Sequence, residues 1–210
     1  MSRPERLLRF GATERLYHWA QGLPFLALLA TGGLLLAGRL RGRPLVDPGL
    51  LVLLHQVSAA TLGAAILLVF VGGDRRTLLA NAARALRWGR DDLVWLIAFP
   101  LAGLVVRLRI PPSGKFNPGQ KINLLAQFVL LPTFAASGLV MWFVPGALLA
   151  WYVHVASFAI AGPLVAGHLY LALLHPATRK GLPGIFTGRV DARWAREHYE
   201  LEYGPDREER

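Results

Sequence analysis

The sequence predicts an all-α integral membrane protein built as a four-helix bundle, and three observations support this fold class. Hydrophobic residues make up 54% of the 210 residues and charged residues only 17%, which leaves too little polar surface for a water-soluble particle. Several uncharged stretches are as long as a membrane-spanning helix requires. The basic residues gather between those stretches, mostly on one predicted side of the membrane.

The uncharged stretches give the positions of the spans. Residues 16–38 contain no Asp, Glu, Lys or Arg over 23 positions, residues 48–73 contain none over 26, and residues 122–178 contain none over 57. A span needs roughly 20 residues, so the last stretch holds two helices, and Pro145-Gly146 is typical of the turn between them. The predicted spans are about 16–37, 50–72, 121–143 and 150–175.

The apolar segment 93–106 is a candidate for a fifth span. Its 14 residues between Asp92 and Arg107 are too few, because segments of this length more often lie in the membrane interface or in a core. With four spans, the N-terminal segment, the long loop and the C-terminal segment carry four, nine and seven basic residues, and the two opposite loops carry three and none. This asymmetry predicts an inner (plasma) membrane protein with both termini in the cytoplasm. With a fifth span, nine basic residues would lie inside and 14 outside. This distribution contradicts the excess of Lys and Arg that cytoplasmic loops carry.

Charge and cysteine content narrow the possible partners and cofactors. The formal charge of +10 could suit nucleic acid, but basic residues that flank apolar runs are typical of contacts with membrane lipid. Nucleic acid is therefore not an expected partner. The chain has no cysteine, which excludes disulfides, thiolate iron–sulfur clusters and the covalent attachment of c-type haem. A cofactor must be held by histidine, carboxylate or backbone groups.

Five of the six histidines lie in or at the ends of the predicted spans, where ionisable residues are costly and usually functional. They are His18, His55, His154, His168 and His175. Taken singly, each could belong to an interfacial aromatic belt or bridge two helices through a hydrogen bond. His175 precedes Pro176 at a helix end without an obvious partner, and His198 lies in the polar C-terminal segment. Depth in the membrane distinguishes the other four.

Depth and spacing group these four histidines into two pairs. The predicted orientation puts His55 and His154 near the outer face and His18 near the cytoplasmic face. His168 follows His154 by 14 residues, which is about 21 Å and close to four helical turns. It therefore returns to the level of His18, on nearly the same helix face as His154. We call His55 and His154 the outer pair, and His18 and His168 the inner pair.

Each histidine pair has the chemistry of a b-type haem site. Two imidazoles at one depth on facing helices can take both axial positions of a haem iron, which leaves no site for oxygen and favours electron transfer. The sequence has no H-E-x-x-H motif, and the spans lack carboxylates for a two-histidine, one-carboxylate centre or a hydrolytic triad. The prediction is a four-helix bundle with two stacked haem b sites. Span 121–143 has no histidine and is expected only to pack.

The turn before span 121–143 is a second candidate site. In Lys115 to Lys121, Pro118-Gly119 fits the centre of a type II turn, with positive φ at the glycine. The turn could simply start a helix that Lys121 anchors. Alternatively, the amides of Asn117 and Gln120 could bond a quinone carbonyl near the inner haem.

Several of these segments together resemble the cytochrome b (gamma) subunit of membrane-bound formate dehydrogenase. The resemblance covers about residues 7–200 and rests on 15–19, Thr31-Gly32, the four paired histidines, 115–121 and 194–198. It implies that His55 and His154 hold the outer haem and that His18 and His168 hold the inner one. It also implies a menaquinone pocket at Asn117, Gly119 and His168. Related cytochrome b subunits of nickel–iron hydrogenase and thiosulfate reductase share the two-haem layout.

The expected function is electron transfer within a larger oxidoreductase complex. The resemblance implies that iron–sulfur and catalytic partner subunits oxidise formate outside, and that electrons pass through the two haems to quinone at the cytoplasmic side. The chain itself has no expected site for substrate oxidation. Another quinone-linked complex and a non-redox membrane anchor are the alternatives. The expected division is a transmembrane domain at 1–180 and a cytoplasmic tail at 181–210, the latter carrying Trp194, His198 and Tyr199.

Overall fold

The structure is a computed structural model that describes residues 5–102 and 109–204. Within these ranges, four helical stretches are long and apolar enough to cross a membrane. They are α1 (Ala12–Leu40), α2 (Pro48–Gly72), α5 (Pro118–Phe143) and Leu148–Leu174, in which α6 (Leu148–Leu169) continues as a π-helical turn over Tyr170–Leu174. Their bounds agree with those of the four predicted spans to within four residues at each end.

Local chemistry explains where the spanning helices begin and where the chain turns between them. The Asp47 side chain accepts a hydrogen bond from the Leu50 backbone N–H at 2.7 Å, and Pro48 occupies the first turn of α2. A proline suits that position because the first N–H groups of a helix have no partner within it. Gly42 and Gly146 adopt positive φ of 68° and 75°, which glycine tolerates without steric cost. The turn predicted at Pro145-Gly146 is confirmed.

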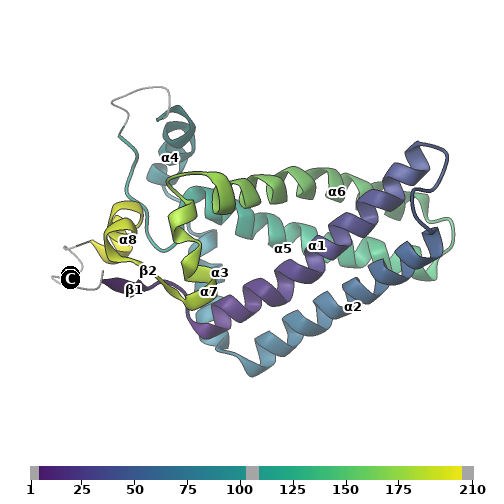
Figure 1. The fold of residues 1–210 in the computed structure, drawn as a ribbon, viewed down its shortest axis with the longest axis horizontal. Coiled ribbons are helices and arrows are strands. Elements are labelled where there is room, and N and C mark those ends of the chain that lie inside the picture. The colour runs from purple at the N-terminus through teal and green to yellow at the C-terminus, as the bar shows by residue number, and fades with distance from the viewer. Residues whose placement is uncertain (1–4, 103–108, 205–210) are drawn as a thin grey trace.

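The spanning helices form two hairpins, with α1 along α2 and α5 along α6 (Figure 1). The chain buries little of these helices. Only 6% of the most apolar window of α1, α2 and α5 is buried, and 11% of the window in the fourth span. Most apolar side chains of the spans are therefore left to contact lipid or other molecules.

Two shorter helices, α3 (Arg75–Leu86) and α4 (Arg90–Leu101), connect the hairpins. α4 covers residues 93–101 of the apolar segment 93–106, and its 12 residues are too few to span. Residues 103–106 lie outside the described residues. α4 lies beside α5, and its Trp95 ring stacks on Phe99 with a centroid distance of 4.4 Å. Phe99 in turn lies 6.3 Å from the ring of His175.

The two ends of the described chain fold together into a small unit outside the four long apolar helices. Strand β1 (Arg6–Leu8) pairs antiparallel with β2 (Arg189–Asp191), so that Leu7 lies opposite Val190. Three short helices complete it: α7 (Pro183–Thr187), α8 (Ala192–His198) and α9 (Glu200–Tyr203). Its core consists of Val190, Trp194, Ala195 and Tyr199, with Leu7 and Tyr203 packed against them. We call residues 5–10 and 179–204 the terminal unit.

The terminal unit lies at the end of the bundle opposite the α1–α2 loop (Figure 1). The segment expected only as a tail thus has a defined fold over its described part, 181–204, because it shares a sheet and a core with the N-terminal strand. Positions 1–4 and 205–210 lie outside the described residues.

Candidate functional site

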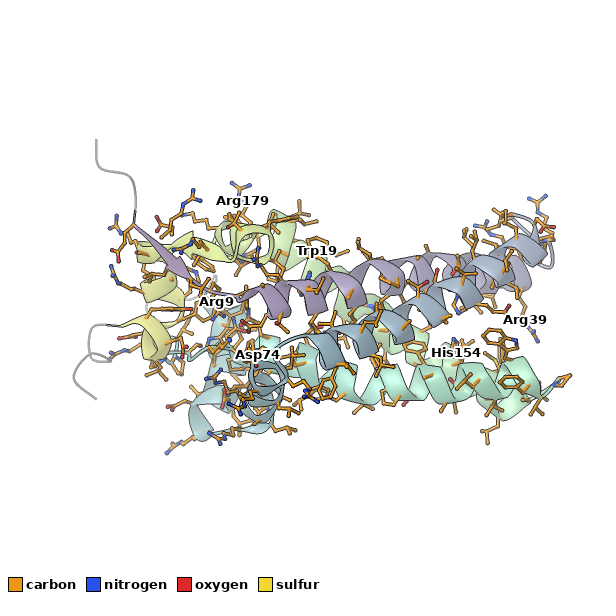
Figure 2. All side chains as sticks on the ribbon, turned by 90° about the horizontal axis from the view of Figure 1, so that it is seen from below. Arg9, Trp19, Arg39, Asp74, His154 and Arg179 are labelled. Carbon is orange, nitrogen blue, oxygen red and sulfur yellow. The ribbon has the colours of Figure 1, made fainter. Side chains whose placement is uncertain are left out.

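The structure brings the four paired histidines together two by two. His55 on α2 faces His154 on α6 with a ring centroid distance of 6.1 Å and an interplanar angle of 63°. His18 on α1 faces His168 on α6 at 6.2 Å and 45°. Figure 2 shows His154 towards the end that carries Arg39, whereas Trp19, the neighbour of His18, lies nearer the end that carries Arg9 and Asp74. The two pairs therefore occupy two levels along the bundle.

Each histidine pair joins one hairpin to the other, because α6 contributes one ring to both pairs and the α1–α2 hairpin contributes the second. His18, His55 and His154 are half-buried and His168 is exposed within the chain itself. Each pair therefore has surface that another molecule can cover, at the junction of the two hairpins.

The ring separation in each pair suits two imidazole ligands on one metal ion. A metal–imidazole nitrogen bond of about 2.0–2.1 Å, with the ring radius added on each side, separates the centroids by roughly 6 Å. No group of three or more His, Cys, Asp or Glu side chains that could hold a metal ion occurs among residues 5–102 and 109–204. A site with two protein ligands needs its remaining ligands from elsewhere, and a haem supplies four from its ring.

Two hydroxyl groups that the sequence analysis did not assign contact the outer pair. Thr31 Oγ1 on α1 lies 2.8 Å from His55 Nδ1, and Ser137 Oγ on α5 lies 2.9 Å from His154 Nδ1. The helix expected only to pack thus carries a side chain that bonds one of the paired histidines. Both hydroxyls are followed by glycine, and this repeated hydroxyl–glycine dipeptide in mid-span was the available signal in the sequence.

The surroundings of the inner pair are aromatic. The His18 ring meets Trp19 edge to face with centroids 5.1 Å apart. Trp19 Nε1 donates to the Ile185 carbonyl at 3.3 Å, and the Trp19 ring lies 5.1 Å from Phe186. His18 Nδ1 is buried without a hydrogen-bond partner among the described residues. The terminal unit therefore reaches the inner pair through α7 and Trp19.

The predicted type II turn at Pro118-Gly119 is wrong, because these residues begin α5. Asn117 is the helix cap: its Oδ1 accepts from Gln120 N at 2.9 Å, and Gln120 Oε1 accepts from Asn117 N at 3.1 Å. Gly119 is not among the glycines with positive φ in the described chain. The reciprocal cap bonds two backbone N–H groups at the helix start, and it overrides the turn preference of the Pro-Gly pair.

The side chains around this helix start tie it to the rest of the molecule. Gln120 Nε2 donates to the Tyr199 hydroxyl in the terminal unit at 3.1 Å. Lys121 Nζ pairs with Asp92 on α4 at 2.6 Å, and Lys115 Nζ pairs with Glu14 on α1 at 2.6 Å. The anchoring role expected for Lys121 is therefore present in the structure.

The two remaining histidines lie apart from the pairs. The His175 ring follows the π-helical turn and contacts Tyr170 and Phe99, with centroids 6.0 and 6.3 Å away. His198 stacks on Trp194 at 4.8 Å, and its Nδ1 donates to the Trp194 carbonyl at 3.1 Å. Each is accounted for by packing on neighbouring aromatic rings.

Comparison with known proteins identifies the family to which this helical membrane bundle belongs. The family model described as prokaryotic cytochrome b561 matches residues 9–188. The formate dehydrogenase cytochrome b556(fdo) subunits of Escherichia coli strains K12, O6:H1 and O157:H7 are each 25% identical to the chain over 209 residues. The matched region covers 95% of this chain and 92% of each relative. The chain therefore belongs to the prokaryotic cytochrome b561 family, whose members are haem b proteins, and is a membrane cytochrome homologous to a formate dehydrogenase cytochrome b subunit.

Proposed function

We propose that this chain carries electrons across the membrane between two haem b groups and delivers them to quinone. His55 and His154 hold the outer haem, and His18 and His168 hold the inner one. The observation that carries the proposal is the pair of facing ring contacts, with centroids 6.1 and 6.2 Å apart at two levels of one bundle. A haem supplies reversible one-electron chemistry when it is bound.

The four histidines set the kind of chemistry that such sites allow. Two imidazoles from one pair would complete the ligands of a haem iron, which would leave no site for oxygen and restrict the chemistry to electron transfer. The rings lie on long apolar helices, and the described chain offers no third His, Cys, Asp or Glu ligand in either pair. The chain orients the cofactors and adjusts their potentials, and the oxidation of substrate belongs to a partner.

The direction of transfer follows from the predicted sidedness. Twenty of the 23 basic residues lie in the segments predicted to be cytoplasmic, so the outer pair faces outside, where the resemblance puts the iron–sulfur and catalytic subunits that would supply electrons. The relatives in Escherichia coli are named as formate dehydrogenase subunits, which favours a formate dehydrogenase-like complex as the partner. The genes beside this one would distinguish it from a hydrogenase or a thiosulfate reductase partner.

Quinone reduction, in this proposal, takes place at the start of α5 beside the inner pair, at Asn117, Gly119, Gln120 and His168. The Asn117 oxygen caps the helix, so the Asn117 side-chain NH₂ is the group left to donate to a quinone carbonyl. Gly119 is the second residue of α5, and its backbone N–H has no partner within the helix. The resemblance implies that the quinone is menaquinone, and its protons would come from the cytoplasm.

The haem assignment is tested by substituting one histidine at a time in the purified protein and measuring haem content and redox spectra. His55→Ala and His154→Ala should each remove the outer haem, and His18→Ala and His168→Ala the inner one. His175→Ala is the matched control and should retain both. Removal of the same haem by His55→Ala and His18→Ala would show that the pairing is wrong.

The quinone site is best tested by a substitution that preserves the helix cap. Asn117→Asp keeps an oxygen that can accept from Gln120 N but removes the NH₂ donor, whereas Asn117→Ala also loses the cap, at a cost of about 1 kcal/mol. The lost bond to a quinone carbonyl costs roughly 0.5–1.5 kcal/mol. Haem reoxidation by a quinone analogue should slow in Asn117→Asp while the reduced spectrum stays normal. Unchanged reoxidation would place the quinone elsewhere.

A further inference from the structure

The outer histidines share an arrangement that the inner histidines lack. Thr31 Oγ1 lies 2.8 Å from His55 Nδ1, and Ser137 Oγ lies 2.9 Å from His154 Nδ1. Thr31 and Ser137 are both buried. In each hairpin, the helix without the outer ligand bonds the histidine of its neighbour: α1 serves α2, and α5 serves α6.

The position of the hydroxyl protons decides which ring nitrogen carries hydrogen. Thr31 Oγ1 also lies 2.8 Å from the Ala27 carbonyl, and Ser137 Oγ lies 2.6 Å from the Thr133 carbonyl. A carbonyl only accepts, and a hydroxyl has one proton to donate, so each hydroxyl donates to the carbonyl and accepts from the ring. Both outer imidazoles therefore carry hydrogen on Nδ1, which leaves the Nε2 lone pairs free to bind a metal.

Glycine allows the rings to approach this closely. A Cβ at Gly32 would lie 3.3 Å from His55 Cε1, and a Cβ at Gly138 would lie 3.5 Å from His154 Cε1. Each ring is thus held by a hydroxyl and lies against the backbone of the residue after it. This double contact restricts both the tautomer and the orientation of the ring.

Among the described residues, the inner pair has no equivalent acceptor. His18 Nδ1 is buried without a partner in the described part of the chain, and no side-chain hydroxyl contacts the His168 ring there. An acceptor on the remote N–H of a histidine ligand raises its basicity. A more basic ligand favours the oxidised iron and lowers the reduction potential, since outer-shell hydrogen bonding is one of the levers on that potential.

We propose that Thr31 and Ser137 are positioning residues that fix the outer histidines and make the outer haem the lower-potential haem of the two. This inference rests on the proposed haem assignment. It gives the chain an internal driving force, because an electron that arrives at the outer haem passes to a site of higher potential at the inner one. The two hydroxyls thus favour transfer from the outer pair to the inner pair.

The test is a potentiometric titration of both haems in the full-length protein, in the variants Thr31→Val and Ser137→Ala. Each variant removes one hydroxyl with little change in volume. The outer haem should move to a more positive potential in each, further in the double variant, while the inner haem stays unchanged. The low-spin ferric signal of the outer haem in electron paramagnetic resonance should shift as well.

Ser157→Ala is the matched control, because Ser157 is a buried serine on α6 whose hydroxyl donates to the Val153 carbonyl at 2.8 Å. It should leave both potentials in place. Thr31→Ser keeps the hydroxyl and should retain the original outer potential.

Several results of these titrations would overturn the inference. An outer potential that does not move, or that falls, in both hydroxyl-free variants overturns the inference, as does an equal shift of the inner haem. If both variants lose the outer haem, the positioning role stands only if Thr31→Ser keeps it. Failure of the haem assignment itself is separate, because it appears as a haem count other than two in the unmodified protein or as loss of the wrong haem in the histidine variants.

Discussion

The outer and inner histidine pairs have nearly the same ring separation but are supported by different parts of the molecule. The outer rings are held inside the membrane bundle, where each bonds a hydroxyl on the other helix of its own hairpin. The inner ring of His18 instead packs on Trp19, which bonds Ile185 and contacts Phe186 in α7. The outer site is therefore complete within the spans, and the inner site depends on residues that follow the last span.

The terminal unit also contacts other segments near the inner pair. Arg9 contacts the Tyr199 ring at 3.7 Å and donates to the Lys115 carbonyl. Gln120, at the start of α5, donates to the Tyr199 hydroxyl. The terminal unit thus connects the N-terminal strand, the helix start proposed for quinone and the support of His18. Disturbing it should affect the inner pair and leave the outer pair intact.

The largest expected effect concerns which pair faces which side. Twenty of the 23 basic residues lie on one side of the four-span arrangement, so a reporter that works only in the cytoplasm should be active when it is fused at residue 210. The same reporter inserted within residues 39–47 should be inactive, because this loop is predicted to lie outside. The reverse pattern would exchange the outer and inner pairs.

A polar substitution in the core of the terminal unit should separate the two sites. Val190 is 1% exposed, and a carboxyl group buried there without partners costs roughly 2–7 kcal/mol. Val190→Asp should therefore weaken or abolish the inner haem while the outer haem keeps its spectrum. Leu201→Asp is the control, because Leu201 is 62% exposed in the same unit. Equal loss of both haems from Val190→Asp alone would contradict the comparison.

A milder change tests the contact between the terminal unit and His18. Trp19→Phe removes the N–H that donates to the Ile185 carbonyl. It also replaces the indole that meets His18 edge to face with a smaller phenyl ring. These contacts contribute about 0.5–1.5 kcal/mol each. The inner haem should dissociate more readily on heating, with the outer haem as the internal reference. Trp142→Phe, at a half-exposed site on α5, should change neither, and a stable inner haem in Trp19→Phe would refute the support assigned to Trp19.

The smallest expected effect is a pH dependence of the Asp74 cap at the start of α3. Thr77 Oγ1 donates to Asp74 Oδ2 at 2.6 Å and Thr77 N donates to Asp74 Oδ1 at 3.1 Å. These bonds lower the pKa of Asp74 below its ordinary value of 3.8. Because the folded pKa is lowered, the cap stabilises α3 above the ordinary pKa and loses that contribution as the pH falls through the folded value.

Carboxyl carbon shifts measured by nuclear magnetic resonance across this range should report the lowered Asp74 pKa. Thr77→Ala should raise it towards 3.8. A value at or above 3.8 in the unmodified protein would contradict the cap geometry. No change at either haem is expected, because Asp74 contacts neither pair.

The sequence by itself determined the four spans and grouped the paired histidines. Bilayer thickness sets the length of the uncharged stretch that a spanning helix needs. The predicted spans therefore agree with the helices to within four residues. The spacing of 14 residues between His154 and His168 follows helix geometry, and the two ring contacts agree with the depths inferred from it. The pairing of the rings could therefore be predicted from the span positions and the helical rise per residue. The role of these histidines as haem ligands stays a prediction.

Only the tertiary structure decided how the rings are held and what the terminal segments do. Thr31 and His55 are 24 residues apart, and Leu7 and Val190 come from opposite ends of the chain, so no local pattern connects them. The start of α5 shows the same limit, since a Pro-Gly pair suits a turn until Asn117 and Gln120 cap a helix there. Bilayer thickness and helical period act along the sequence, whereas hydrogen bonds and packing between distant segments depend on how the hairpins meet.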